Sequence, residues 1–297
     1  MMTVRRTTKT DKGVMMMTSY AHPEVLVTTD WVREHRNDSN VKIIEIDVDT
    51  ASYDNGHIPG AIGFNWQSQL QDQVQRDIIS RHEFAELVGA AGIQAGDTVV
   101  VYGDNNNWFA AYGFWLFKFY GHDDVRLMDG GRVKWLKEDG ELSKDTPAVT
   151  AVTYPITRVA QEYRAMLPEV LNASSAGTSN LVDVRSPDEF TGKIIAPPNL
   201  PETAQRGGHI PGATNVPWVT AVNTDDGTFK AAEELHSIYV DLAGVDPNKP
   251  TIAYCRIGER SSHTWFVLKY LLGVPDVKNY DGSWTEYGNL IAAPIER

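Results

Sequence analysis

Hydrophobic residues fall along the chain in short apolar runs that alternate with segments of helical period. Apolar runs rich in β-branched residues predict strands, and they lie at 41–48, 98–102, 125–128, 181–184, 251–254 and 277–280. Helices are expected between them, at about 81–91, 108–120, from 131 onward and at 261–272. The sequence Ser80-Arg81-His82-Glu83 is typical of the capping box that opens a helix. Strands separated by helices predict an α/β fold with mostly parallel sheets that helices cover on both faces.

The pattern occurs twice, because the stretch GHIPGA at Gly56–Ala61 returns at Gly208–Ala213. The offset of 152 positions from His57 to His209 also relates Tyr102 to Tyr254, Gly121 to Gly273, Val125 to Val277 and Asp129 to Asp281. Upstream the offset is 138, so the second half carries about 14 extra residues, which we place in the loop-like stretch 191–206. A repeat of this length indicates two similar α/β domains related by internal duplication.

Composition places the domain boundaries. Residues 143–155 are rich in Ser, Thr, Pro and Ala and read as a linker between an N-terminal domain at 21–142 and a C-terminal domain at 156–297. Residues 1–20 are mostly polar and basic, and we expect a disordered extension there.

Charge and length exclude several classes of protein. The net charge of −12 argues against nucleic acid as a partner. No apolar run reaches the ~18 residues of a membrane span, and the first 20 residues lack the features of a signal peptide. We therefore expect a cytoplasmic protein with no membrane partner. The single cysteine, Cys255, cannot form an intramolecular disulfide, so its interest lies in its chemistry.

Cys255 follows a predicted strand directly and precedes a predicted helix. A loop of this kind can point successive backbone N–H groups inward, and the helix N-terminus adds positive potential, so an anion would sit there. Arg256 and Arg260 add to this field, and we expect it to lower the pKa of the thiol and hold a nucleophilic thiolate. The alternative is an inert buried cysteine.

The segment Cys255–Ser261, CRIGERS, together with Asp183-Val184-Arg185 and the two GHIPGA turns, resembles the tandem-domain rhodaneses, the thiosulfate sulfurtransferases, and within them the actinobacterial type. The resemblance implies that Cys255 takes the outer sulfur of thiosulfate as a persulfide and passes it to an acceptor such as cyanide or a thiol. It implies no cofactor beyond that covalent persulfide. The expected partners are a small-molecule sulfur donor and acceptor, with thiol or dithiol proteins as further acceptors.

The resemblance also implies a set of site residues. Substrate-binding residues are Arg185 and the loop residues Arg256, Ile257, Gly258, Glu259 and Arg260. A solvated surface arginine is the alternative for Arg185, and Asp183 is expected to be a buried carboxylate that orients Arg185 or the loop.

The first half is expected to be catalytically silent, because Gly103 stands at the position of Cys255. Trp108 and Phe109 are candidates for an apolar wall of the cleft, or else simply begin a buried helix. His57 and His209 are duplicated with the turns, which favours a structural role. No metal site is expected, since the chain has no cysteine cluster and no H-x-x-x-H stretch.

Three other functions share parts of this pattern. A cysteine phosphatase or arsenate reductase needs an arginine six positions after the cysteine, where this chain has Ser261. A 3-mercaptopyruvate sulfurtransferase would have the same two domains but an uncharged loop, whereas Arg256 and Arg260 favour the dianion thiosulfate. A sulfur-carrier or interaction module would use the same persulfide on Cys255.

Overall fold

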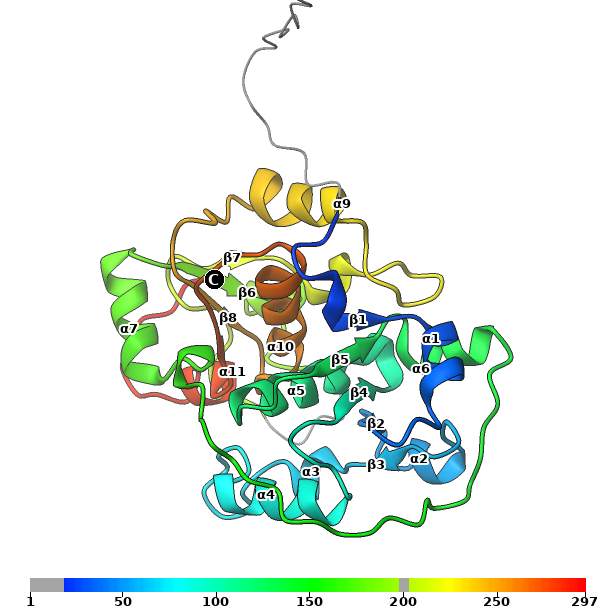
Figure 1. The fold of residues 1–297 in the computed structure, drawn as a ribbon. Coiled ribbons are helices and arrows are strands. Elements are labelled where there is room, and N and C mark those ends of the chain that lie inside the picture. Colours follow the sequence, from blue (N-terminus) through cyan, green and yellow to red (C-terminus); the bar gives the residue numbers. More distant parts are fainter. Residues whose placement is uncertain (1–18, 198–202) are drawn as a thin grey trace, which may run out of the picture.

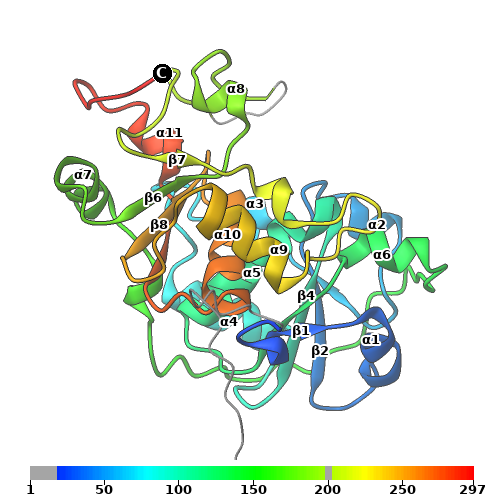
Figure 2. The same cartoon turned by 90° about the horizontal axis from the view of Figure 1, so that it is seen from above.

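The computed structural model describes residues 19–197 and 203–297, which form two α/β domains side by side (Figure 1; Figure 2). The first domain contains, in order, η1 (Pro23–Val25), β1 (Leu26–Val27), α1 (Thr29–His35), β2 (Val41–Glu45), α2 (Ser52–Asn55), β3 (Ile62–Gly63), α3 (Trp66–Gln69), α4 (Arg81–Ala90), β4 (Thr98–Tyr102), α5 (Asp104–Phe119), β5 (Val125–Met128) and α6 (Gly131–Lys137). The second contains η2 (Gln161–Tyr163), α7 (Leu167–Ala176), β6 (Asn180–Asp183), α8 (Pro187–Phe190), β7 (Thr214–Asn215), η3 (Trp218–Ala221), α9 (Ala232–His236), η4 (Ser237–Leu242), β8 (Thr251–Tyr254), α10 (Glu259–Phe266), η5 (Val267–Leu271), β9 (Val277–Tyr280) and α11 (Ser283–Tyr287). The predicted α/β fold and its internal duplication are confirmed.

Both sheets are parallel throughout, with strand orders β1-β5-β4-β2-β3 and β7-β6-β8-β9. The corresponding strands β4 and β8 lie inside their sheets, and α5 and α10 follow them. In parallel sheets, ligands bind beyond the carboxyl ends of such strands. The topology therefore places Cys255, the residue after β8, where chemistry is expected.

The side chains of β4 point alternately to the two faces of the first sheet, which explains why helices cover both faces. Val100 and Tyr102 join the buried cluster that includes Val32 of α1 and Trp135 of α6. Val99 and Val101 join the main core with α4 and α5. Side chains of a strand point alternately to opposite faces, so a strand that is apolar throughout needs a layer on each side.

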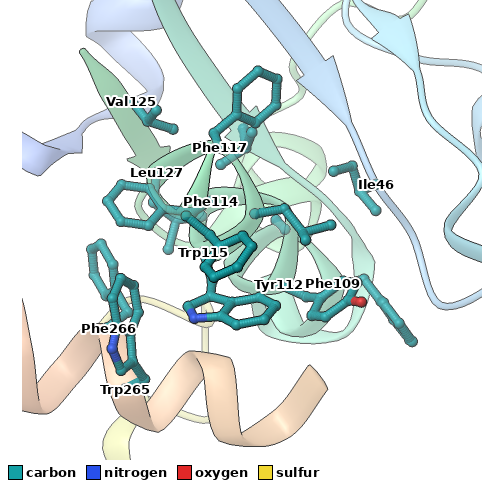
Figure 3. Close-up of a cluster of buried hydrophobic side chains, with 14 of the residues drawn as sticks. Ile46, Phe109, Tyr112, Phe114, Trp115, Phe117, Val125, Leu127, Trp265 and Phe266 are labelled. Carbon is teal, nitrogen blue, oxygen red and sulfur yellow. The ribbon is translucent and has the colours of Figure 1, made fainter. Parts of the chain in front are cut away.

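The two domains meet mainly through α5 and α10, the helices that follow the two equivalent loops. Figure 3 shows aromatic residues of α5 facing Trp265 and Phe266 of α10. The ring centroids of Phe114 and Phe266 are 4.9 Å apart in an edge-to-face arrangement, which is a favourable geometry for aromatic pairs. Because these helices pack together, the loop before each of them lies at the domain boundary.

The two GHIPGA turns are structural, as the duplication predicted. The ring of His57 stacks on Tyr53 with centroids 3.8 Å apart, and that of His209 stacks on Phe190 at 3.5 Å. Each imidazole also contacts the backbone carbonyl of its aromatic partner at 2.9 Å. These contacts occupy both histidines within their own domains.

The remaining segments differ in how far the structure describes them. Between Lys137 and Gln161 the chain forms no helix or strand, and Val152 donates a backbone hydrogen bond to Gly89. The predicted extension 1–20 lies outside the described residues except for its end, where Tyr20 donates a 2.9 Å hydrogen bond to the carbonyl of Lys230. The predicted insertion at 191–206 contains residues 198–202, which are also outside them. Across the described ranges, no helix has the length and apolarity needed to cross a bilayer.

Candidate active site

Cys255 is held by its backbone at the end of β8. Its N–H donates to the Ser283 hydroxyl at 3.0 Å, and its carbonyl accepts the N–H of Trp284 at 3.0 Å. Its side chain is completely buried. Ser283 adopts φ +54°, and Gly131, its counterpart in the first half, adopts φ +52°. Ser283 was not predicted as a site residue, although the change from Asp-Gly-Gly to Asp-Gly-Ser between the halves could have indicated it.

The thiol sulfur lies inside the turn of its loop. The N–H of Gly258 donates to Sγ at 3.1 Å, and the thiol contacts Oε2 of Glu259 at 3.3 Å. Gly258 has φ +96°, and a Cβ on it would lie 2.5 Å from the Cα of Asp281. Only glycine combines this backbone conformation with so close a neighbour. The loop therefore needs glycine here to turn an N–H toward the sulfur.

The expected lowering of the thiol pKa is wrong for this buried loop. Burial raises the pKa of the Cys255 thiol, and the charge of Glu259 raises it further, against smaller opposite effects of Arg260 and of hydrogen bonds from Ser261. Removal from water disfavours the charged form of a thiol. Both effects favour the neutral thiol in the resting site, and the burial that causes the first could not be read from the loop sequence.

Residues of β9 and α10 anchor the loop from behind. The carbonyl of Gly258 accepts hydrogen bonds from the N–H and hydroxyl of Ser262 and from the amide of Asn279 at 3.0 Å. The hydroxyl of Ser261 donates to the same Asn279 side chain at 2.6 Å. Asn279 carried no signal in the sequence, because its contacts depend on the pairing of β9 with β8. This network fixes the start of α10 relative to Cys255.

Arg260 is anchored by a carboxylate from the neighbouring strand–helix connection. Its two terminal nitrogens bind the carboxylate of Glu189 at 2.9 and 3.0 Å. Burial acts to raise the pKa of Glu189, but the hydrogen bonds and charge of Arg260 lower it below its usual value. Glu189 is the third residue of a capping box that Ser186 opens, so the sequence Ser-Pro-Asp-Glu was a signal for its placement. Much of the positive charge expected at Arg260 is balanced within the protein.

Of the other loop residues, Arg256 and Glu259 form an ion pair and Ile257 packs in the hydrophobic core. Nη2 of Arg256 is 3.7 Å from Oε1 of Glu259, and Nε of Arg260 is 3.9 Å from the same oxygen. Glu259 therefore lies between the two loop arginines. Ile257 belongs to the main hydrophobic core, so it can offer a substrate only its backbone.

Arg185 is completely buried, which rules out the surface alternative. Its guanidinium binds the carboxylate of Asp183, with the shortest contact at 2.6 Å, and donates to the carbonyl of Gly208 at 2.7 Å. It also lies over the ring of Trp284 at 4.6 Å. The predicted orienting role of Asp183 is confirmed. These contacts tie β6 to the second GHIPGA turn. Nη1 of Arg185 is buried and makes no hydrogen bond to the described residues, so substrate binding by Arg185 stays a prediction.

The equivalent loop of the first domain differs in both backbone and chemistry, because Asn105, Asn106 and Asn107 all have positive φ, whereas only Gly258 does in the cysteine loop. Asn107, at the position equivalent to Glu259, accepts the N–H of Gly103 at 3.1 Å and donates to the carbonyl of Met128 at 2.7 Å. Gly103 stands where Cys255 stands in the second domain. This loop thus presents neither a nucleophile nor a charged side chain at those two positions.

Trp108 joins the two loops across the domain boundary, and Phe109 does not. The guanidinium carbon of Arg260 lies 5.5 Å from the ring centroid of Trp108, which also packs against Trp218 at 5.4 Å. Phe109 instead stacks on Trp66 at 4.3 Å inside the first domain. The contacts of Trp108 fit the predicted wall of the cleft, and those of Phe109 fit the alternative of a buried helix start.

The arrangement suits a nucleophilic thiol in a buried loop. The sulfur has one backbone N–H and one carboxylate beside it, and two arginines follow it in the loop. Within 19–197 and 203–297, no group of three or more His, Cys, Asp or Glu side chains is placed to hold a metal ion. Preorganised N–H groups in such surroundings stabilise negative charge that develops during a reaction.

Comparisons with known proteins identify the family of the chain. A model of the rhodanese-like domain matches residues 28–138 and 166–290. A provisionally named thiosulfate sulfurtransferase of Saccharopolyspora erythraea is 57% identical over 274 residues, covering 92% of this chain and 96% of that protein. The sulfur carrier protein TtuD of Thermus thermophilus is 54% identical over 282 residues, covering 94% and 98%. SseA of Escherichia coli, described as a 3-mercaptopyruvate sulfotransferase with the rhodanese fold, superimposes with a TM-score of 0.75 at 29% identity, covering 88% and 98%. The chain therefore belongs to the rhodanese family and contains two rhodanese-like domains in tandem.

Proposed function

We propose that this sulfurtransferase moves the outer sulfur of thiosulfate through a persulfide on Cys255 to an acceptor such as cyanide or a thiol. The observation that carries the proposal is the position of Sγ, 3.1 Å from the N–H of Gly258 in a loop that continues into a helix. An N–H at this distance stabilises negative charge on sulfur. The names of the relatives, a thiosulfate sulfurtransferase and a sulfur carrier, support the same chemistry.

The proposed reaction has two balanced steps. The thiolate of Cys255 attacks the outer sulfur of thiosulfate, the sulfur–sulfur bond of thiosulfate breaks, and sulfite leaves with the electron pair. Cyanide or a thiolate then attacks the terminal sulfur of the persulfide, which yields thiocyanate or a new persulfide and restores the Cys255 thiolate. No external oxidant or reductant is needed, because each step exchanges one nucleophile for another.

Intact-mass measurement tests the first step directly. After thiosulfate treatment, the wild type should gain about 32 Da, one sulfur atom, and Cys255→Ser should gain none. Cys255 is the only cysteine of the chain, so no other thiol can take up the sulfur. The same mass gain in Cys255→Ser would refute the proposed role of Cys255.

A comparison of donors separates thiosulfate from 3-mercaptopyruvate. Glu189 and Glu259 lie against the loop arginines, which weakens the simple charge argument for thiosulfate. The proposal still expects kcat/KM to be at least about ten-fold higher for thiosulfate, a difference of ~1.4 kcal/mol. A preference for 3-mercaptopyruvate, the substrate in the description of SseA, would replace thiosulfate as the donor and leave Cys255 in the same role.

A further inference from the structure

We propose that Glu259 is the catalytic base of sulfur transfer: it takes the proton of the Cys255 thiol, holds it while the persulfide exists, and returns it when the acceptor leaves. The inference rests on the proposed function, since it concerns the same cysteine. It assigns Glu259 a role in proton transfer beyond the substrate binding that the resemblance implies.

The geometry of the pair is that of an acid and its base. The thiol of Cys255 donates toward Oε2 of Glu259 at 3.3 Å, and both side chains are buried. Among the described residues, no other carboxylate makes a hydrogen bond to this sulfur. A catalytic base must lie within hydrogen-bond reach of the proton it removes. Glu259 meets that condition already in the resting loop.

The site also needs a base. Cys255 has no exposed surface through which its proton could pass directly to water. Burial and the neighbouring carboxylate keep the proton on sulfur at neutral pH, and a neutral thiol is a poor nucleophile. Removing the proton within the loop is therefore part of making the nucleophile.

The first domain carries no carboxylate at the equivalent point of its loop. Asn107 occupies the position of Glu259 and accepts the N–H of Gly103 with its amide oxygen, whereas Glu259 faces the thiol sulfur. The carboxylate is found in the domain where a thiol occupies the first position of the loop.

The surrounding charges favour the proposed cycle. On its own loop, Oε1 of Glu259 faces Arg256 and Arg260 at 3.7 and 3.9 Å and makes no hydrogen bond within the described chain. Neighbouring elements place three further groups near the loop. Glu189 lies behind Arg260, and Asp281 lies beside Gly258. The third is Tyr112 of α5, whose phenol pKa is raised mainly by burial and slightly by Glu259. When Glu259 becomes neutral, both guanidinium groups lose an anionic neighbour. Their charge then stabilises the persulfide anion and the leaving sulfite.

Charge and protons balance over the cycle. The Cys255 thiol, the Glu259 carboxylate and thiosulfate become a Cys255 persulfide anion, a protonated Glu259 and sulfite, with a total charge of −3 on each side. Cyanide then removes the terminal sulfur as thiocyanate. The resulting Cys255 thiolate recovers its proton from Glu259, so no proton is exchanged with solvent.

The test is the rate of sulfur loading as a function of pH, measured by rapid quench and intact mass. Loading of the wild type should be nearly independent of pH between about 6 and 8, because the base is built in. Glu259→Gln should load about 100-fold more slowly at pH 7, and its rate should rise about ten-fold per pH unit because its proton must go to solvent. Glu259→Asp should restore the flat profile at a reduced rate. Glu45→Gln, which removes a buried carboxylate of the other domain, should behave as the wild type.

Infrared difference spectra provide a readout that a purely structural role would not change. A protonated carboxylic-acid band should appear when the wild type is loaded with thiosulfate and be absent in Glu259→Gln. The inference is overturned if Glu259→Gln loads as fast as the wild type, if its slower rate stays independent of pH, or if the wild type shows no such band. A wild type that takes up no sulfur would overturn the proposed function and this inference together. Normal loading of the wild type with any of the three results would overturn this inference alone.

Discussion

His263 is completely buried on α10 one turn after the cysteine loop, against the rings of Trp218 and Phe229. Neither ring nitrogen has a hydrogen-bond partner among the described residues. Burial lowers the pKa of His263 from 6.5 to about 3. The folded protein therefore binds this proton less readily than the unfolded chain. By linkage, His263 costs no stability above pH 6.5, and stability falls as the pH decreases from 6.5 toward 3.

Replacing His263 by Leu should remove this pH dependence. At pH 7 the two proteins should differ little, because the imidazole is neutral and packed as an apolar group. At pH 4 the wild type should have lost up to a few kcal/mol more of its free energy of unfolding than His263→Leu. Urea unfolding at both pH values measures this difference. Parallel losses in the two proteins would show that His263 does not carry the acid sensitivity.

Site residues that follow one another in the sequence could be predicted. Those that meet only through contacts between different elements could not. Cys255 and its arginines could be identified because a strand, a loop and a helix follow one another in sequence. The partner of Arg260, Glu189, lies 71 positions away, and no local pattern indicates how far its carboxylate balances the charge of the arginine. The direction of the Cys255 pKa was missed for the same reason, since burial is a property of the packed domains.

At the level of the elements, the strands were predicted best. The ranges 98–102, 125–128, 251–254 and 277–280 agree with β4, β5, β8 and β9. All four are short and largely buried, so the apolar run defines them. The two-residue strands β1, β3 and β7 were missed, because such lengths leave no period to detect. Helix α5 begins before the predicted Trp108, at Asp104, through three asparagines at positive φ that no helical pattern could indicate.

The cysteine loop should tolerate no side chain at its glycine. Gly258→Ala combines positive φ with a Cβ 2.5 Å from the Cα of Asp281, so the N–H that faces Sγ must move. We expect the sulfur-loading rate to fall at least about 100-fold, because loss of a positioned donor commonly costs that much. Gly212→Ala is the matched control, since Gly212 has φ +79° but open space around it. It should cost about 1 kcal/mol of stability and leave the loading rate unchanged. Equal rates in both variants would contradict the role of the loop N–H.

In the whole molecule, the first domain contacts the cysteine loop through the start of one helix. Trp108 of α5 lies over Arg260 and against Trp218, so it connects the first domain to the cysteine loop. Trp108→Ala should lower kcat/KM for thiosulfate about ten-fold, in line with the ~1–2 kcal/mol of a desolvated cation–π contact. Trp108→Phe should retain most of the activity.

An arginine–tryptophan contact outside the site provides the control for the loss of a tryptophan side chain. The guanidinium carbon of Arg126 in β5 lies 5.2 Å from the ring centroid of Trp31 in α1. Helix α1 is on the opposite side of the first sheet from α5. Trp31→Ala should lower the melting temperature without changing kcat/KM. If Trp108→Ala and Trp31→Ala lose activity equally, the contact between the domains has no specific role in the reaction.

A single-turnover transfer shows whether Cys255 carries sulfur from donor to acceptor. The wild type is loaded with thiosulfate, freed of excess donor, and mixed with cyanide, after which thiocyanate and intact mass are measured. We expect about one thiocyanate per loaded chain, a return to the unmodified mass, and no thiocyanate from Cys255→Ser treated in the same way. A loaded wild type that keeps its added sulfur in cyanide, or equal thiocyanate from Cys255→Ser, would contradict this role of Cys255.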